Sequence, residues 1–391
     1  MSKFNIGIDA RMYGPRQTGI GVYIESLINE LSKIDKENHY HIFLLSEEYK
    51  KFQLPTNNFS KIEVNSHWYS FKEQVFFLKK ITKEKLDLMH FTHFNFPIFY
   101  PSKFVITIHD ITPKFVPGYK MGKSWYRRKA YDLMLKKGIA KSDRVIVPSE
   151  ETKKDLINYY EAKKNKIEVI YEGIKKKKTA EERKEFINNY SQNKEVALKK
   201  LKEKYGMKSL RKPYVFYVGV WREHKNLINL IRAFSLLVKK HGFKGQLVLG
   251  GAPSDFYSEI KMEWRARGLA GRVVTPGFLI GEKLELLYEA ADLFVLPSLY
   301  EGFGLVTLEA LNNGTAVACS DIPVLREVTQ NKMIYFNPTN PEEIARKMND
   351  ILRNKRSQVS LLRESQRVID SYNWKKMADE IHEIYINILK S

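Results

Sequence analysis

The feature that most constrains this fold is a regular alternation between short apolar runs and longer amphipathic segments, which occurs twice along the chain. Short apolar runs are typical of buried strands, and the segments between them are long enough for helices. Strands that alternate with helices form parallel βαβ units, so each half is expected to form an open α/β sheet. In the first half, predicted strands lie at 4–9, 41–45, 88–90, 104–109 and 144–148, and predicted helices at 20–31, 72–84, 124–140 and 150–160.

The second alternation begins at Pro213, after a polar segment that breaks the rhythm. Its predicted strands lie at 214–219, 246–250, 273–275, 293–297 and 316–319. The segment before it starts with lysines at 175–178 and then favours helix, so we interpret it as a basic linker with an inserted helix. The sequence therefore predicts an α/β protein with two Rossmann-like, doubly wound domains at 1–171 and 213–371, a linker at 172–212 and a final segment at 372–391.

Length and cysteine content narrow the class of protein. A chain of 391 residues can form two or three domains, each with its own core. The single cysteine, Cys319, excludes an intramolecular disulfide framework and a thiolate zinc cluster, which favours a reducing cytoplasm. The sequence shows neither a signal-peptide pattern nor an apolar run of the ~20 residues that cross a bilayer. We therefore expect a cytoplasmic protein that is not integral to a membrane.

The net charge of +21 is concentrated in the first half of the chain. Residues 1–212 carry +18, whereas residues 213–391 carry +3, from 23 basic and 20 acidic side chains. Within the first half, 175–212 carries +9, and 120–141 holds eight basic residues against one acidic residue. This distribution suits an anionic membrane surface, a phosphorylated substrate or a nucleic acid, and a merely solvated lysine-rich surface is the alternative.

A glycine-containing loop follows the first predicted strand. Gly19 and Gly21 allow the backbone to approach a ligand, and the N–H groups at the start of the next helix favour an anion. A plain turn between strand and helix is the alternative. The spacing is not that of a dinucleotide site, G-x-G-x-x-G, and the chain contains no G-x-x-x-x-G-K-[ST]. Both absences disfavour a dehydrogenase and a P-loop nucleotide hydrolase.

Two cations follow the first strand of the second predicted domain. Arg222 and Lys225 stand three residues apart, after Gly219 and before a helix. A forked guanidinium beside an ammonium suits a diphosphate, although a solvated basic turn would show the same spacing.

The most specific pattern is the segment Pro-Ser-Leu-Tyr-Glu-Gly-Phe-Gly-Leu-Val-Thr-Leu-Glu at 297–309. It places Glu301 on the loop after a strand and Glu309 inside the helix that follows. Backbone N–H groups of the loop can bind an anion, and the two carboxylates can accept hydrogen bonds from hydroxyl groups. Phosphate-binding donors beside hydroxyl-binding carboxylates predict a sugar-nucleotide site.

Together these motifs resemble the retaining glycosyltransferases of family 4 (glycosyl transferases group 1), which have the two-domain GT-B fold and include bacterial mannosyltransferases. The resemblance covers nearly the whole chain and extends to the motifs at 69–74, 90–97, 106–113 and 372–374. It implies that a helix starting near Tyr372 crosses back to the first domain. The pair of glutamates is specific to the family, whereas the motifs of the first half vary between its members.

The resemblance also implies roles for individual residues. Arg222 and Lys225 would stabilise the leaving nucleoside diphosphate, and Glu301 would contact the transferred sugar. The implied catalytic residues are His109, Arg222, Lys225 and Glu301. The implied donor-binding residues are Gly19, Gly21, Arg222, Lys225, Phe278, Leu279, Glu301, Gly302, Phe303, Gly304, Leu305 and Glu309, the last of these at the ribose. The implied acceptor-binding residues are Tyr69, Glu73, His93 and Asp110.

The expected reaction is transfer of a hexose, with retention, from a nucleotide sugar to a hydroxyl of a glycan or lipid-linked glycan in bacterial envelope polysaccharide synthesis. GDP-mannose is the preferred donor because the segments at 8–11 and 109–110 look most like those of mannosyltransferases, and a UDP-sugar is the alternative. We expect no cofactor and no metal ion, since the chain contains no Asp-x-Asp pair to hold one.

Two other classes of protein stay open at this point. A nucleic-acid-binding protein would account for the charge but not for the two glutamates, and no such motif is present, so we expect no nucleic-acid partner. A glycan phosphorylase of similar fold would require a lysine-bound pyridoxal phosphate. The basic first half is expected to place the protein peripherally on the inner face of the plasma membrane.

Overall fold

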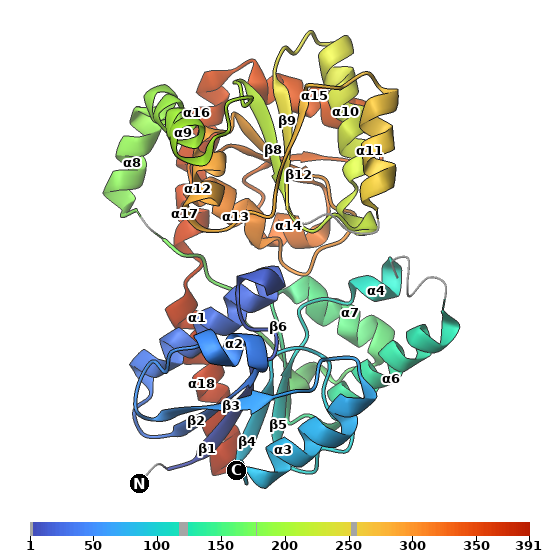
Figure 1. The fold of residues 1–391 in the computed structure, drawn as a ribbon, viewed down its shortest axis with the longest axis vertical. Coiled ribbons are helices and arrows are strands. Elements are labelled where there is room, and N and C mark those ends of the chain that lie inside the picture. The colour runs from blue at the N-terminus through green and yellow to red at the C-terminus, as the bar shows by residue number, and fades with distance from the viewer. Residues whose placement is uncertain (1–2, 117–123, 177, 252–255) are drawn as a thin grey trace. The chain divides into compact units, whose positions relative to one another are not determined.

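The computed structural model describes residues 3–116, 124–176, 178–251 and 256–391 and divides into two compact units (Figure 1). The first unit comprises Met1–Gly173 and Tyr372–Ser391, and the second comprises Ile174–Ser371. Each unit is an open parallel sheet covered by helices, which confirms the predicted α/β fold class. Among the described residues, no helix combines the length and the apolar character needed to cross a bilayer.

The sheet of the first unit, within the described residues, has seven parallel strands in the order β3-β2-β1-β4-β5-β6-β7. They are β1 (Asn5–Asp9), β2 (His39–Leu45), β3 (Phe59–Val64), β4 (Leu88–Phe91), β5 (Phe104–Thr107), β6 (Arg144–Val147) and β7 (Ile167–Val169). Every residue of β4 and β5 is buried, as expected for strands covered on both faces. The strand order reverses between β1 and β4, and such a reversal leaves an open crevice beyond the carboxyl ends of the two strands.

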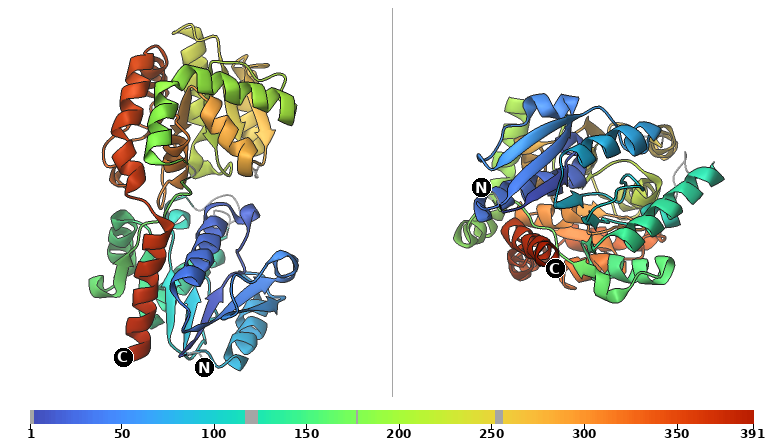
Figure 2. Two further views of the ribbon diagram at one scale, coloured as in Figure 1. Left: turned by 90° about the vertical axis from the view of Figure 1, so that its left-hand side faces the viewer. Right: turned by 90° about the horizontal axis from the view of Figure 1, so that it is seen from below.

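The helices of the first unit are α1 (Thr18–Ile34), α2 (Ser46–Lys51), α3 (Leu78–Lys83), α4 (Thr112–Phe115), α6 (Trp125–Lys141), α7 (Glu150–Tyr160) and α18 (Trp374–Lys390), with a π-helical turn η2 (Glu73–Phe77) before α3. Helix α18 begins at an Asn373 cap and packs against α1, as Figure 2 shows. Its Tyr385 is fully buried in the first unit. The predicted return of a C-terminal helix to the first domain is therefore confirmed.

In the second unit, the part of the chain that the structure describes contains six parallel strands in the order β10-β9-β8-β11-β12-β13. They are β8 (Tyr214–Val218), β9 (Gln246–Gly250), β10 (Val273–Gly277), β11 (Leu293–Leu296), β12 (Val317–Ser320) and β13 (Ile334–Phe336). This order reverses between β8 and β11, so both units have the doubly wound topology.

The helices of the second unit lie between and around these strands. They are α8 (Ala180–Asn188), α9 (Tyr190–Tyr205), α10 (Leu227–Lys239), α11 (Tyr257–Ala266), α12 (Gly281–Ala290), α13 (Leu305–Asn312), α14 (Pro323–Val328), α15 (Pro341–Leu352), α16 (Lys355–Glu364) and α17 (Gln366–Asp370), with a short 3₁₀ turn η4 (Glu223–Lys225) after β8.

The segment 172–212 differs from the linker with one inserted helix that the sequence predicted. Its described residues form two helices, α8 and α9, which belong to the second unit. Helix α9 packs along α12 and buries Leu198 and Leu201. Lys194 of α9 is also buried, and its Nζ donates to the backbone carbonyls of Glu289, in the last turn of α12, and of Ala291, just after that helix. The segment 172–212 is rich in charged residues, but one face of each of its helices packs into the core of the second unit. Of the other basic stretch noted in the sequence, 120–141, residues 120–123 lie outside the described residues.

The two chain connections between the units begin side by side in the first unit. The chain leaves the first unit after residue 173 and re-enters it at Tyr372. The rings of Tyr171 and Tyr372 lie 5.9 Å apart in an edge-to-face arrangement. The second unit is therefore inserted into the first at one place.

Burial lowers the pKa of Lys194 from its ordinary 10.5 to about 7. The unfolded chain then binds more protons than the folded chain between these pH values, so stability rises with pH across this window. We expect Lys194→Met to remove this rise, which amounts to at most about 1.4 kcal/mol per pH unit. Thermal unfolding of both proteins at pH 7 and pH 9 measures the effect. The Tm of the wild type should rise relative to that of the variant between the two pH values, and a difference between the Tm values that does not change with pH contradicts the prediction.

Candidate active site

In the second unit, the loops after β8 and β11 meet at the point where the strand order reverses. The N–H of Leu299 donates to the carbonyl of His224 over 2.8 Å. The Asn226 side chain donates to the carbonyl of Pro297 over 2.9 Å. Asn226 adopts a left-handed backbone conformation, with a φ of 57°, which asparagine tolerates better than most residues. These hydrogen bonds fix the positions of the two loops relative to each other.

The centre of this site is an ion pair between the two loops. Lys225 Nζ lies 2.7 Å from Glu301 Oε1, and the Ser298 hydroxyl donates to the same oxygen over 2.6 Å. The Lys225 and Glu301 side chains are only 19% and 10% exposed, so solvent screens this pair weakly. No described residue hydrogen-bonds to the other oxygen, Oε2, which leaves it able to accept from a ligand hydroxyl. The structure thus brings together two residues that the sequence placed 76 positions apart.

Arg222 supplies a second cation near Lys225. Its side chain is exposed and forms no ion pair with a carboxylate in the described part of the chain. His224 lies between the two cations in sequence and is buried, and this burial, with Lys225 and Arg222 nearby, lowers its pKa to about 2. His224 therefore stays neutral, and the positive charge of this turn resides on Arg222 and Lys225.

The loop 302–304 leads into α13 through a residue that must be glycine. Gly304 has a φ of 84°, and a Cβ there would lie 2.5 Å from the Leu325 side chain. Among the described residues no side chain caps the start of α13, and its first turn, which begins at Leu305, holds no acidic residue. Uncapped N–H groups at a helix start carry partial positive charge and favour an anion.

Glu309 is the second carboxylate of the site and is held by a neighbouring helix. The hydroxyl of Tyr288, on α12, donates to Glu309 Oε2 over 3.0 Å. Tyr288 is fully buried, and this burial raises the pKa of its hydroxyl well above the ordinary value, so it remains a donor. Tyr288 could not be predicted as part of the site, because it precedes Glu309 by 21 positions and lies on another helix.

Residues 278, 279 and 303 occupy different environments. Phe278 is 42% exposed and can meet a flat ligand, as predicted for a donor contact. Leu279 is 5% exposed and Phe303 is also 5% exposed, so both side chains pack in the core of the unit. A donor contact through the Leu279 side chain, which the resemblance implied, does not fit this burial.

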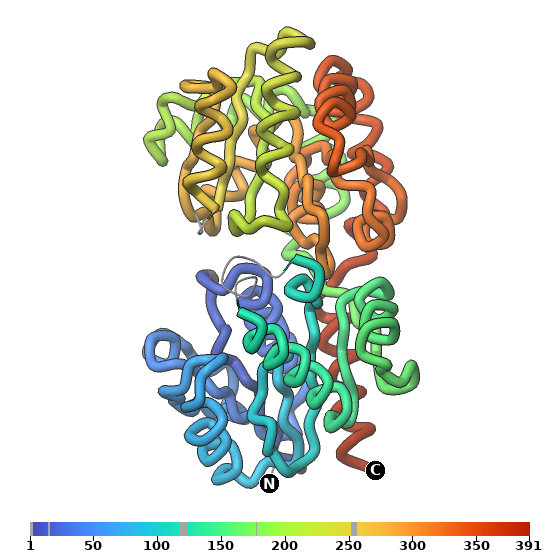
Figure 3. Tube along the Cα trace, turned by 90° about the vertical axis from the view of Figure 1, so that its right-hand side faces the viewer, coloured from blue at the N-terminus to red at the C-terminus, as the bar shows by residue number. Residues whose placement is uncertain are grey.

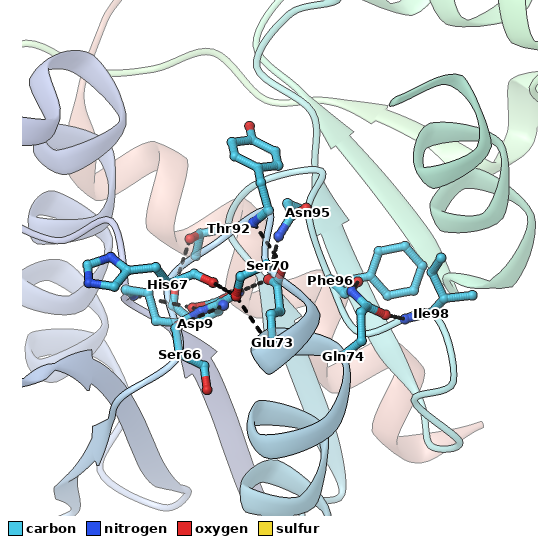
Figure 4. A network of polar contacts seen from close by, with 12 residues as sticks. Asp9, Ser66, His67, Ser70, Glu73, Gln74, Thr92, Asn95, Phe96 and Ile98 are labelled. Carbon is cyan, nitrogen blue, oxygen red and sulfur yellow. Dashed lines mark hydrogen bonds and ion pairs between the residues drawn. The ribbon is translucent and has the colours of Figure 1, made fainter. Parts of the chain in front are cut away.

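In the first unit, a buried ionic cluster lies where the strand order reverses between β1 and β4 (Figure 4). Arg11 donates to both oxygens of Asp9 over 2.8 and 2.7 Å and lies 2.7 Å from Glu73. Asn95 donates to Glu73, and the Arg11 guanidinium lies 3.9 Å above the Phe77 ring. Asp9, Arg11 and Glu73 are 5%, 3% and 0% exposed. Glu73 is therefore an internal partner of Arg11, which corrects the predicted acceptor contact.

Beside this cluster is a small cavity with an unsatisfied polar atom. It is lined by Asp9, Arg11, Met12, Trp68, Thr92, His93 and Asn95. Nδ1 of His93 is buried and has no hydrogen-bond partner among the described residues. Burial, with His109 and Arg11 nearby, lowers the pKa of His93 well below its ordinary value, so the ring is neutral. Tyr69, 60% exposed, presents its ring edge-to-face to His93 at 6.1 Å, so these two predicted acceptor residues do lie together.

His109 is fixed by contacts on both ring nitrogens. Nε2 lies 3.0 Å from the carbonyl oxygen of Thr92, and Nδ1 lies 3.3 Å from Glu172 Oε1. The ring of Tyr23 packs edge-to-face against it at 4.9 Å. Glu172 was missed at the sequence level, because it lies 63 positions away, just before the boundary of the unit. Asp110, the neighbour of His109, accepts from the Thr112 N–H over 2.7 Å and so holds the turn that starts α4.

The two glycines before α1 differ in their surroundings. A Cβ on Gly21 would lie 2.0 Å from the Gly14 carbonyl oxygen, so Gly21 is required by chain packing alone. A Cβ on Gly19 would meet no atom within 4 Å. In the described residues no side chain caps α1, which leaves its start, like that of α13, open to an anion.

The chain matches the family description "Glycosyltransferase Family 4" over residues 18–178 and "Glycosyl transferases group 1" over residues 199–369. The chain belongs to glycosyltransferase family 4. Similar proteins include the uncharacterized glycosyltransferase MJ1607 of Methanocaldococcus jannaschii, which is 28% identical over 62% of this chain and 60% of that protein. The O-antigen chain mannosyltransferase RfbU of Salmonella typhimurium is 26% identical over 70% of this chain and 66% of its own length. The aligned part thus spans less than two thirds of either relative.

Solved structures share the fold of this chain. Sucrose-phosphate synthase from Thermosynechococcus elongatus matches with a TM-score of 0.77 at 18% identity, covering 99% of this chain and 100% of that one. WaaG, a glycosyltransferase involved in lipopolysaccharide biosynthesis, matches with a TM-score of 0.72 at 14% identity over 97% and 99% of the two chains. The predicted GT-B architecture is thereby confirmed.

The ionic cluster of the first unit generates a stability prediction. Arg11→Met would leave Asp9 and Glu73 as buried carboxylates without their cation, so we expect a loss of about 3–5 kcal/mol in the free energy of unfolding. The matched control is Arg16→Met, which removes an exposed arginine paired with exposed Glu47 at 2.8 Å and should cost at most about 1 kcal/mol. Urea unfolding measures both variants. Equal losses would show that the buried cluster is not a special stabilising feature.

Proposed function

We propose that this protein transfers a hexose, with retention of anomeric configuration, from a nucleotide sugar to a hydroxyl of a glycan or lipid-linked glycan. The observation that carries the proposal is the Lys225–Glu301 ion pair at the strand-order reversal of the second unit. A cation there suits a diphosphate, and a carboxylate held by that cation suits the sugar next to the diphosphate. Family membership supports the same class of reaction.

Each group at the second site has a role in donor binding under this proposal. Arg222, Lys225 and the N–H groups at the start of α13 bind the diphosphate, and Glu301 Oε2 accepts from a hydroxyl of the transferred sugar. Glu309, oriented by Tyr288, accepts from the ribose hydroxyls. Phe278 is exposed enough to contact the base. Gly19, at the open start of α1, is the glycine of the first unit that we assign to donor binding.

The chemistry proposed is a front-face displacement. The bond from the anomeric carbon to the phosphate oxygen breaks, the acceptor oxygen bonds to that carbon from the same face, and the acceptor proton passes to the leaving phosphate. Glu301 is a poor nucleophile, because Lys225 and Ser298 both bind its Oε1. The main catalytic task is then to stabilise the charge of the leaving diphosphate with fixed cations and N–H groups. We propose that these groups make a divalent metal ion unnecessary.

The first unit is assigned to the acceptor. His93 Nδ1 offers an unsatisfied polar atom in a neutral ring, and the exposed Tyr69 beside it offers an aromatic surface for a sugar. His109 is assigned to the donor sugar and is held for that task by Thr92 and Glu172. The acceptor proposed is an envelope polysaccharide or its lipid-linked precursor, reached from the cytoplasmic side of the membrane.

GDP-mannose is the proposed donor, and relatives named as mannosyltransferases support it. A UDP-sugar is the second candidate, because the fold relative HepE of Anabaena is described in complex with UDP-glucose.

A donor screen tests the proposal. We expect GDP-mannose to raise the Tm of the protein more than UDP-glucose or ADP-glucose does, since binding to the folded state alone stabilises it. Transfer from GDP-mannose to an α-mannoside acceptor should persist in excess EDTA. If only UDP-sugars raise the Tm, the proposed donor changes from GDP-mannose to a UDP-sugar. If EDTA abolishes the activity and Mg²⁺ restores it, the assignment of charge stabilisation to Arg222 and Lys225 is wrong.

Variants of the second site test the assigned roles. Glu301→Gln and Glu309→Gln should each lower kcat/KM by about 5- to 150-fold, which corresponds to about 1–3 kcal/mol for one lost charged hydrogen bond. Arg222→Ala with Lys225→Ala should lower it by at least ~100-fold, or ~2.7 kcal/mol. Glu342→Gln, an exposed position on α15, is the matched control and should match the wild type. Near wild-type kcat/KM in either glutamate variant would remove that residue from the site.

A further inference from the structure

Tyr217 of β8 carries a fully buried hydroxyl group that forms no hydrogen bond within the described part of the chain. Buried polar groups in proteins are almost always paired, so an unpaired one calls for an explanation. Strand β8 lies inside the sheet of the second unit, and Figure 3 shows helices α10 and α11 covering one face of that sheet. A phenylalanine would give the same packing without an unpaired hydroxyl, so packing does not explain the tyrosine.

This hydroxyl lies at the end of β8 that leads into the candidate active site. A Cβ added to Gly219 would lie only 2.7 Å from the Tyr217 oxygen, so the glycine leaves room for the hydroxyl beside the chain. The turn that carries Arg222 and Lys225 follows directly. Burial raises the pKa of Tyr217 well above its ordinary value, and the nearby Glu301 carboxylate raises it further, so the hydroxyl keeps its proton. The site therefore contains a buried, unused hydrogen-bond donor near Glu301.

Glu301 needs a further donor once Lys225 binds a diphosphate. Within the described residues, Lys225 at 2.7 Å and Ser298 at 2.6 Å both bind the same carboxylate oxygen, Oε1. An ammonium that turns toward a diphosphate pairs less strongly with the carboxylate, because its N–H groups are then divided between two anions. The Glu301 side chain is only 10% exposed, and a buried carboxylate that loses its cation is strongly destabilised unless another donor replaces it. Ser298 alone supplies one hydrogen bond.

We infer that Tyr217 is a positioning residue for Glu301, and that its hydroxyl donates to this carboxylate when Lys225 binds the diphosphate of the donor. Ser298 and Tyr217 then fix the carboxylate together, and its remaining lone pairs are available to a hydroxyl of the transferred sugar. Lys225 can thus change from one anion to the other without leaving a buried charge unpaired. The inference deepens the proposed function and rests on it for the identity of the diphosphate.

A double-mutant cycle on thermal stability tests this contact without any ligand. In the wild-type background, Tyr217→Phe should leave the Tm unchanged or raise it, since it removes an unpaired buried hydroxyl. Lys225→Met removes the cation from Glu301, and in this background Tyr217→Phe should lower the Tm by about 2–4 °C, the effect of one lost hydrogen bond in a unit of this size. The matched control on the same strand is Tyr214→Phe, which removes a hydrogen bond of 2.7 Å to the Leu287 carbonyl and should lower the Tm equally in both backgrounds.

Transfer assays test the role of Tyr217 in the reaction, with the nucleotide sugar that raises the Tm most and at a temperature where every variant is folded. Tyr217→Phe should lower kcat/KM by about 10-fold, the effect of one lost hydrogen bond to a charged group, whereas Tyr214→Phe should match the wild type. The same change of Tm on Tyr217→Phe in both backgrounds, or wild-type kcat/KM in Tyr217→Phe, overturns the inference. If the Tm values show the expected coupling in a protein that transfers no sugar, the contact between Tyr217 and Glu301 stands and only the proposed function fails.

Discussion

The reversal of strand order inside each parallel sheet is the constraint on which the rest of the structure depends. Right-handed crossovers place the connections of neighbouring strands on opposite sides of the sheet wherever the winding direction changes. Between β8 and β11 this leaves room for Lys225 and Glu301 to meet, and between β1 and β4 it leaves room for Arg11 and its partners. The chemistry of both units therefore sits where the backbone topology opens the sheet edge.

The two reversal points use charge in opposite ways. In the first unit the guanidinium of Arg11 is paired with both Asp9 and Glu73, and Asp9 and Arg11 line the neighbouring cavity. In the second unit Arg222 remains exposed and only Lys225 is paired. Under the proposed function, the site that receives a diphosphate needs such uncommitted positive charge, whereas the site that receives a neutral sugar needs fixed polar atoms without a net field.

Much of the fold followed from the sequence, because fully buried strands produce continuous apolar runs. The strands that the sequence did not predict lack this signal: β3 reads Phe-Ser-Lys-Ile-Glu-Val at the sheet edge, and β7 and β13 are three residues long. Within the site, Glu301 and Glu309 were found from a local motif. Glu172 and Tyr288 could not be, since each acts through a contact that only the tertiary fold creates.

The insertion of the second unit at a single place in the first has an evolutionary consequence. Both junctions lie together at the Tyr171–Tyr372 ring contact, so the first sheet and α18 are completed by segments on either side of one gap. A module with neighbouring ends can be exchanged for another without altering the host fold. Recombination at these two points would pair the existing first unit with a different second unit, and under the proposed function this would give new combinations of acceptor and donor specificity in one step.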